Sequence, residues 1–366
     1  MSGERRRGGR LDWKALLGIA LGVGLLGYSL RGVDVAAVTH EIGRADPLLF
    51  LASAVLAAAP ILVRAWRWRA LLEPIRRGTS FRARFEASMI GFMANNVLPA
   101  RIGEFARAYT LSRMEPVPVV ASFGSLVVER LLDGVVVAMY LFLAMALPGF
   151  PGIGATEGTD PGGAALMMLA LMGGVGLGLL VLVLRPESVL RIAERWVAPL
   201  LPASLRGPVL RMLSTFLTGL AALRRPSLLA RAGLWSLGVW AVNAAAFWVG
   251  FRAFGIDVPF SAALFLQSLV ALAVALPAAP GFFGLWEAAT RVGLHEIWGV
   301  PLDKAVGFAL GFHIGSFLVV TVWGLYYAWR LGLSWSDVRR GEAMAEREAD
   351  GTAGSGASPR PEQVRR

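Results

Sequence analysis

The strongest constraint on this chain is its set of long apolar stretches, several of which reach the roughly 20 residues that a helix needs to cross a bilayer. Hydrophobic residues make up 56% of its 366 residues, and charged residues only 17%. A soluble domain has about 45–50% apolar and about 25% charged residues. These features exclude an ordinary water-soluble enzyme and predict an all-α, polytopic membrane protein.

About six of the apolar stretches are expected to be full transmembrane helices. They cover residues 13–30, 47–63, 117–147, 164–184, 232–254 and 305–329. The first follows the arginines at positions 5, 6, 7 and 10, a layout that signal peptides share. Because no small-residue cleavage site follows it, we expect a retained helix.

The distribution of basic residues orients these spans. The chain has 36 Lys and Arg against 25 Asp and Glu, and its formal net charge is +11. Arginines concentrate at the N-terminus, in residues 64–84, in residues 185–231 and after residue 329, whereas residues 148–163 contain no Lys or Arg. The positive-inside rule therefore predicts a multi-pass protein of the cell (inner) membrane with both termini cytoplasmic. Residues 1–335 form one membrane domain, followed by a polar tail, 336–366, that is expected to be disordered.

Two further stretches, residues 85–113 and 261–299, have flanks on one side of the membrane and are expected to be re-entrant helical hairpins. Proline removes a backbone donor and disfavours helix at the residue before it. Both stretches contain a Leu-Pro-Ala turn with Gly four residues after a Pro, in opposite orientations. The pattern favours an inverted repeat, although Pro and Gly could instead kink two ordinary helices. The expected breaks are at Pro99, Gly103, Pro277, Pro280, Gly281 and Gly284.

Charged residues inside the third span and beside the hairpin breaks are the candidate functional residues. Glu129 and Asp133 are four residues apart, and Arg130 can pair with Asp133. Ionisable groups within a span cost roughly 2.5–3.5 kcal/mol each, so they line a cavity or pair unless they lie at the inner interface. Two interpretations remain open for these residues: they bind substrate or relay charge, or they form a purely structural bridge. The full set is Asn96, Arg101, Glu104, Arg107, Glu129, Arg130, Asp133, Glu287 and Arg291.

Other motifs give weaker signals. Trp66, Arg67 and Trp68 form an aromatic-basic run that is expected to be an interfacial anchor, with arginine on lipid phosphates. The chain has no cysteine and only three histidines, and it lacks zinc-protease, nucleophile-elbow and Walker motifs. We therefore expect no metal, no cofactor and no enzymatic activity. Nucleic acid is not an expected partner, because the basic residues flank hydrophobic spans.

Taken in order, these motifs resemble the lysylphosphatidylglycerol synthase transmembrane-region family, which includes the flippase portion of the multiple peptide resistance factor. The similarity covers roughly residues 11–332, and it departs from the family pattern at Phe282, where a second Gly is common. The motifs that carry it are Arg67-Trp68, Asn96-x-x-Pro99-x-Arg101-x-Gly103-Glu104-x-x-Arg107, Glu129-Arg130-x-x-Asp133 and Pro280-Gly281-x-x-Gly284-x-x-Glu287.

The resemblance implies a lipid translocase that moves an anionic phospholipid, a glycolipid or a polyprenyl-phosphate-linked lipid between leaflets. The alternative is an integral-membrane enzyme or accessory subunit that acts on such a lipid beside a partner synthase or glycosyltransferase. Membrane lipids with anionic headgroups are the expected partners, and a homo-oligomer is compatible with the sequence.

Overall fold

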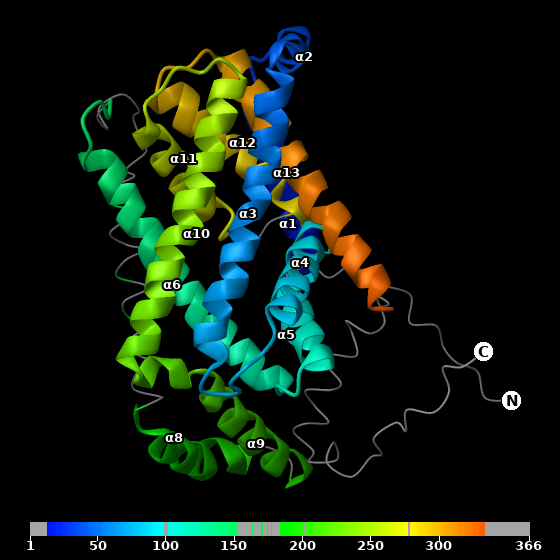
Figure 1. The fold of residues 1–366 in the computed structure, drawn as a ribbon, viewed down its shortest axis with the longest axis vertical. Helices are drawn as coiled ribbons and strands as arrows, with labels where there is room; N and C mark the ends of the chain where they lie inside the picture. Colours follow the sequence, from blue (N-terminus) through cyan, green and yellow to red (C-terminus); the bar gives the residue numbers. More distant parts are fainter. Residues whose placement is uncertain are drawn as a thin grey trace, which may run out of the picture.

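The computed structural model describes residues 13–98, 102–151, 163, 170, 174, 177, 184–200, 203–276 and 279–333. Every regular element within these ranges is helical, which confirms the all-α prediction (Figure 1). The N-terminal arginines, nearly all of the expected span 164–184, and the tail after residue 333 lie outside the described residues, as do Pro99, Arg101 and Pro277.

The chain begins with three helices, α1 (Trp13–Ser29), α2 (Val35–Arg44) and α3 (Pro47–Leu72). Asp34 caps α2 by accepting from the backbone N–H of Ala36, and Asp46 caps α3, which has Pro47 at its first position. Carboxylates at helix N-termini satisfy donors that lack an intrahelical partner. α3 continues nine residues beyond the expected end at residue 63, and three arginines, Arg64, Arg67 and Arg69, therefore lie inside it.

Helices α4 (Phe81–Val97) and α5 (Gly103–Met114) form a tight antiparallel hairpin. A Cβ at Gly103 would lie 2.1 Å from the carbonyl oxygen of Gly91, so the two backbones touch. The side chain of Asn95 closes the turn by accepting from the N–H of Gly103 at 2.9 Å. Helix α5 thus begins at Gly103, and the close approach of the two backbones leaves no room there for a larger residue.

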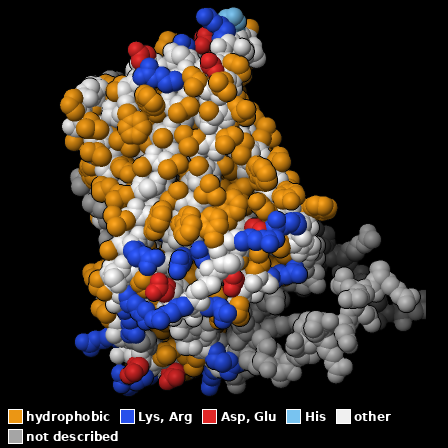
Figure 2. All heavy atoms as spheres, in the orientation of Figure 1, with side chains coloured by type: hydrophobic (Ala, Val, Ile, Leu, Met, Phe, Trp, Pro, Cys, Tyr) orange, Lys and Arg blue, Asp and Glu red, His pale blue; other side chains and the backbone are white. Residues whose placement is uncertain are grey.

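Helix α6 (Val119–Ala146) is long and carries the charged motif near its middle. The segment that precedes α10 consists of α8 (Pro186–Ile192), η3 (Ala193–Val197), η4 (Ala198–Leu200), α9 (Ala203–Gly219) and η5 (Ala221–Arg224). These elements lie at one end of the molecule (Figure 1). Figure 2 shows Lys and Arg side chains gathered at this end, below a broad apolar belt, and we call it the arginine-rich end.

The C-terminal part starts with α10 (Pro226–Ala253) and α11 (Phe260–Ala273). It continues through η6 (Pro280–Phe282), α12 (Leu285–Thr290), η7 (Arg291–Ile297) and α13 (Leu302–Arg330). Three described helices, α3, α10 and α13, are long and apolar enough to cross a membrane. α6 has 28 residues, but three charged side chains interrupt its apolar character.

A second helical break lies between α11 and α12, where Gly281 and Gly284 have φ values of +69° and +89°. A Cβ at Gly284 would lie 2.0 Å from the carbonyl oxygen of Gly22 in α1, so glycine is required by both conformation and space. Phe282 also has a positive φ, +63°, which is the left-handed region that favours glycine. The position at which the chain departs from the family pattern, Phe282, therefore has an unusual backbone conformation for a residue other than glycine. Element η6 contacts α4, so the two breaks lie near each other.

Candidate functional site: a buried arginine–carboxylate cluster

Five charged side chains from three helices meet in the interior, and we call them the arginine cluster: Arg64, Arg67, Arg107, Glu129 and Asp133. Arg64 and Arg67 lie one turn apart on α3, Arg107 is on α5, and both carboxylates are on α6. None of the five residues is more than 7% exposed. Glu129 and Asp133 share one face of α6 because they are four residues apart.

Glu129 is held mainly by two arginines. Arg107 donates through Nη1 and Nη2 to its two carboxylate oxygens, at 2.6 and 3.1 Å, in bidentate geometry. The Nη2 of Arg67 lies 2.9 Å from Glu129 Oε1. The guanidinium of Arg107 also lies over the ring of Trp68 at 4.0 Å, where a cation is attracted to the aromatic face.

Asp133 is held by the two arginines of α3 and by α10. Arg64 and Arg67 each donate to it at 2.5 Å, and the Nε1–H of Trp240 donates at 3.1 Å. Arg67 also donates to the hydroxyl of Ser236 at 2.8 Å. Ser236 and Trp240 could not be predicted from local sequence patterns, because their partners lie more than 100 residues away in the chain.

The cluster holds more positive than negative charge. Three arginines face two carboxylates, which leaves a net charge of +1. The Nε–H groups of Arg67 and Arg107 are buried without a hydrogen-bond partner among the described residues. Arg64 donates to a carboxylate through Nη1 alone, and its guanidinium otherwise lies near the rings of Phe92 and Trp240. Unsatisfied donors beside excess positive charge form an environment that suits an anion.

Arg130 and Glu104 form the rim of the cluster. Arg130 Nη2 lies 2.5 Å from Glu104 Oε1, and its Nη1 lies 3.5 Å from Asp133 Oδ2. The Arg130 side chain is 43% exposed, so this pair connects the buried charges to the protein surface. Since Arg130 and Glu104 neutralise each other, the net charge of the site remains +1.

The interpretation of residues 66–68 as an interfacial anchor is wrong for two of its three members. Arg67 and Trp68 are fully buried, because Arg67 pairs with carboxylates of α6 and Trp68 donates to Ser125 at 2.8 Å. Trp66 is 45% exposed and stacks near Trp235, so its contact with the interface remains a prediction.

The remaining candidates lie elsewhere. Glu287 contacts His313 instead of the arginine cluster, and Asn96 donates to Thr321 on α13 at 3.0 Å. Arg291 donates to the backbone carbonyls of residues 28 and 29, the last two of α1, and of residue 31 just beyond it. This is a helix-capping arrangement. The described residues therefore bring together Glu104, Arg107, Glu129, Arg130 and Asp133, but not Asn96, Glu287 or Arg291.

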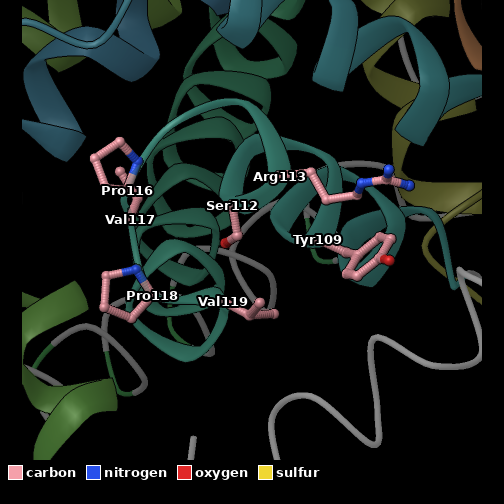
Figure 3. A pocket seen from close by; sticks show the side chains of 7 residues that line it. All are labelled: Tyr109, Ser112, Arg113, Pro116, Val117, Pro118 and Val119. Carbon is pink, nitrogen blue, oxygen red and sulfur yellow. The ribbon is translucent and has the colours of Figure 1, made fainter. Parts of the chain in front are cut away.

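A separate cavity of about 330 Å³ lies where α5 turns into α6 (Figure 3). Its lining comes from the end of α5 and the start of α6, and it includes no member of the arginine cluster. The lining residues are Tyr109, Ser112, Arg113, Pro116, Val117, Pro118 and Val119.

The apolar belt, the long apolar helices and the charges buried between them define a multi-pass helical membrane protein. Residues 15–324 match the family described as the Lysylphosphatidylglycerol synthase TM region, and the chain belongs to this family.

Several curated proteins are similar over most of the chain. A glycosyltransferase, AglD, of Haloferax volcanii is 28% identical over 331 residues, which cover 84% of this chain and 53% of that protein. The chain thus spans about half the length of this relative. Two UPF0104 membrane proteins of Methanothermobacter thermautotrophicus are 23% and 26% identical. The matches cover 86% and 80% of this chain and 91% and 86% of those proteins, respectively. No solved structure matches the chain.

Proposed function

We propose that this chain is a lipid translocator in which the arginine cluster binds the phosphate of an anionic lipid during its passage between leaflets. The observation that carries this proposal is the net charge of +1 among five buried side chains, with guanidinium N–H groups that have no partner among the described residues. In this proposal the chain has no catalytic centre. Its family membership and its apolar belt support a substrate that resides in the membrane.

The proposed topology has about six spans and two re-entrant hairpins, with both termini cytoplasmic. The arginine-rich end then faces the cytoplasm, in line with the positive-inside rule. Helices α4 and α5 enter from this end, and α11 and α12 enter from the other. Contact between η6 and α4 supports a meeting of the hairpins inside the membrane, the layout of many transporters with inverted repeats.

The position of the arginine cluster, midway along α6, also supports the proposal. Asp133 is the fifteenth of 28 residues in α6, so the cluster lies about 21 Å from the start of a helix about 42 Å long. Charges midway along such a helix are costly unless they pair or bind a ligand. The pairing described above leaves one cation in excess, which a lipid phosphate would neutralise.

Arg64 is the arginine best placed to take that phosphate. It binds Asp133 through Nη1, and its other N–H groups, which have no hydrogen-bond partner in the described part of the chain, suit a second, bidentate acceptor. Removing its charge leaves two arginines and two carboxylates, with each carboxylate still bound by at least one arginine. Arg64→Gln should therefore fold while losing affinity for the phosphate.

Binding of phosphatidylglycerol to the purified protein, measured by native mass spectrometry, tests this role. Loss of one charge-assisted hydrogen bond of about 1.5–3 kcal/mol predicts a roughly 10- to 150-fold weaker affinity for Arg64→Gln. Arg252→Gln is the matched control, because Arg252 pairs with the exposed Asp257 outside the cluster. Diacylglycerol, which lacks the phosphate, should bind both variants alike. Equal phosphatidylglycerol affinity in the two variants would refute the assignment.

A second candidate function is favoured by one observation, the similarity to a protein named as a glycosyltransferase. In this alternative, the chain presents a lipid-linked substrate to a partner glycosyltransferase and moves no lipid itself. Reconstitution separates the two functions, because a translocator acts in vesicles without a partner enzyme, whereas a presenting subunit requires one.

A further inference from the structure

A second pair of buried titratable groups lies apart from the arginine cluster. Glu287 on α12 and His313 on α13 are joined by a 2.7 Å contact between Oε1 and Nδ1. Their side chains are 1% and 6% exposed. They are 26 residues apart in the chain and come from two different helices, so the tertiary fold brings them together.

The protein backbone and two aromatic rings fix this pair. The N–H of Gly284 donates to Glu287 Oε2 at 2.6 Å, so both carboxylate oxygens are engaged. The rings of Phe283 and Trp286 lie 4.6 and 4.7 Å from the imidazole centroid. Nε2 of His313 makes no hydrogen bond with the described residues and remains free to take up a proton.

No other charged group among the described residues contacts the pair. Arg291, four residues after Glu287, donates to the backbone carbonyls at the end of α1 and lies near Glu296, which accepts from Tyr28. The neighbouring helix α11 offers Gln267, which bonds to Asn243 of α10 and does not titrate. The charge of the pair therefore depends on the protons that it holds itself.

We propose that Glu287 and His313 form a proton-binding site that couples lipid movement to a proton gradient, an inference that rests on the proposed function. With one proton between them, the pair has a net charge of −1. A second proton, taken from water at Nε2, gives an imidazolium beside a carboxylate and a net charge of zero. Release of this proton on the other side of the membrane restores the starting state, and no other bond changes.

Helix α10 links this pair to the arginine cluster. Ser236 and Trp240 contact the cluster, and Phe247, two turns further along the same helix, packs on Trp286 with ring centroids 5.5 Å apart. His313 is about 17 Å along α13 from its start, whereas Arg64 is about 26 Å along α3 from its start. Both helices start at the end opposite the arginine-rich end (Figure 1), so the proton site lies nearer that opposite end.

Nuclear magnetic resonance of ¹³C-histidine-labelled protein tests proton binding without any transport. The chain has three histidines, and His313→Asn identifies its signal while keeping an amide donor close to the position of Nδ1. The His313 signal should change with pH if Nε2 takes up a proton, and Glu287→Gln should change this response. His40→Asn, at an exposed position of α2, is the control. A His313 signal that does not move with pH would overturn the proton site.

Vesicles with an imposed pH gradient test the coupling. One pH unit corresponds to a distribution ratio of up to about tenfold for each coupled proton. The wild type should therefore accumulate labelled phosphatidylglycerol in one leaflet, and His313→Asn should lose this asymmetry but bind the lipid normally. Lipid movement that ignores the gradient in the wild type would overturn the coupling alone. Absence of lipid movement under every condition would instead refute the proposed function, and the coupling with it.

Discussion

Replacement of Glu129 by Gln tests how the buried charges balance. Glu129 accepts from Arg107 at 2.6 and 3.1 Å and forms an ion pair with Arg67 at 2.9 Å, with no exposure to solvent. Glutamine keeps the shape of the side chain but raises the net charge of the cluster from +1 to +2. Breaking a buried ion pair by removing one partner costs about 3–5 kcal/mol. This loss corresponds to a roughly 150- to 5,000-fold shift of the folding equilibrium.

A double-mutant cycle with Arg107→Met makes the prediction specific. Alone, Arg107→Met should destabilise the protein, because it removes the bidentate partner of Glu129. In the Glu129→Gln background it should restore stability, since Arg64 and Arg67 then face Asp133 with the original net charge of +1. The free energy of unfolding, measured by titrating mixed micelles with a denaturing detergent, gives the coupling energy. A Glu129→Gln cost below about 1 kcal/mol, or additive effects of the two changes, would refute this account of the cluster.

Three further outcomes follow from the described contacts. Gly284→Ala should prevent accumulation of the folded protein, because a Cβ there would lie 2.0 Å from the α1 backbone. Gly24→Ala should be tolerated, since no atom lies within 4 Å of its Cβ position. Fluorescence-detected gel filtration compares the amounts of folded protein. The chain has no cysteine, so single cysteines report on orientation. A cysteine replacing Asp257 should be labelled only from outside, and one replacing Arg191 only from the cytoplasm. The reverse pattern would reject the proposed orientation. Arg291→Gln should lower the unfolding free energy by about 1–3 kcal/mol, because α1 loses a cap, and should leave the affinity for phosphatidylglycerol unchanged. A loss of affinity in the folded variant would instead show that Arg291 contributes to lipid binding.

The sequence predicted the helical class and the position of the charged motif on α6. Apolar stretches and spacing are local properties, and the expected third span, 117–147, agrees closely with α6 (Val119–Ala146). The break before Gly103 was also predictable, because proline disfavours helix at the residue before it. These features depend on residues that are near one another in the chain.

The ion pairs between residues far apart in the chain could not be predicted from the sequence. Arg64 and Arg67 were expected at the end of a span, since isolated arginines are unfavourable in an apolar helix. Their carboxylate partners on α6 lie more than 60 residues away, and pairing allows α3 to continue to Leu72. A signal was available in the spacing, because arginines three residues apart share one helical face. No comparable signal identified Trp240 as a partner of Asp133.

The most direct test of the central claim is movement of lipid in vesicles that contain this chain alone. Phosphatidylglycerol carrying a headgroup fluorophore is placed in both leaflets, and a membrane-impermeant reductant then bleaches the outer leaflet. We predict that wild-type protein exposes the inner-leaflet label to bleaching, while folded Arg64→Gln protects it to the level of protein-free vesicles and Arg252→Gln behaves as the wild type. Equal bleaching with Arg64→Gln and wild type, or protection of the inner-leaflet label by the wild type, would contradict phosphate-dependent translocation through the arginine cluster.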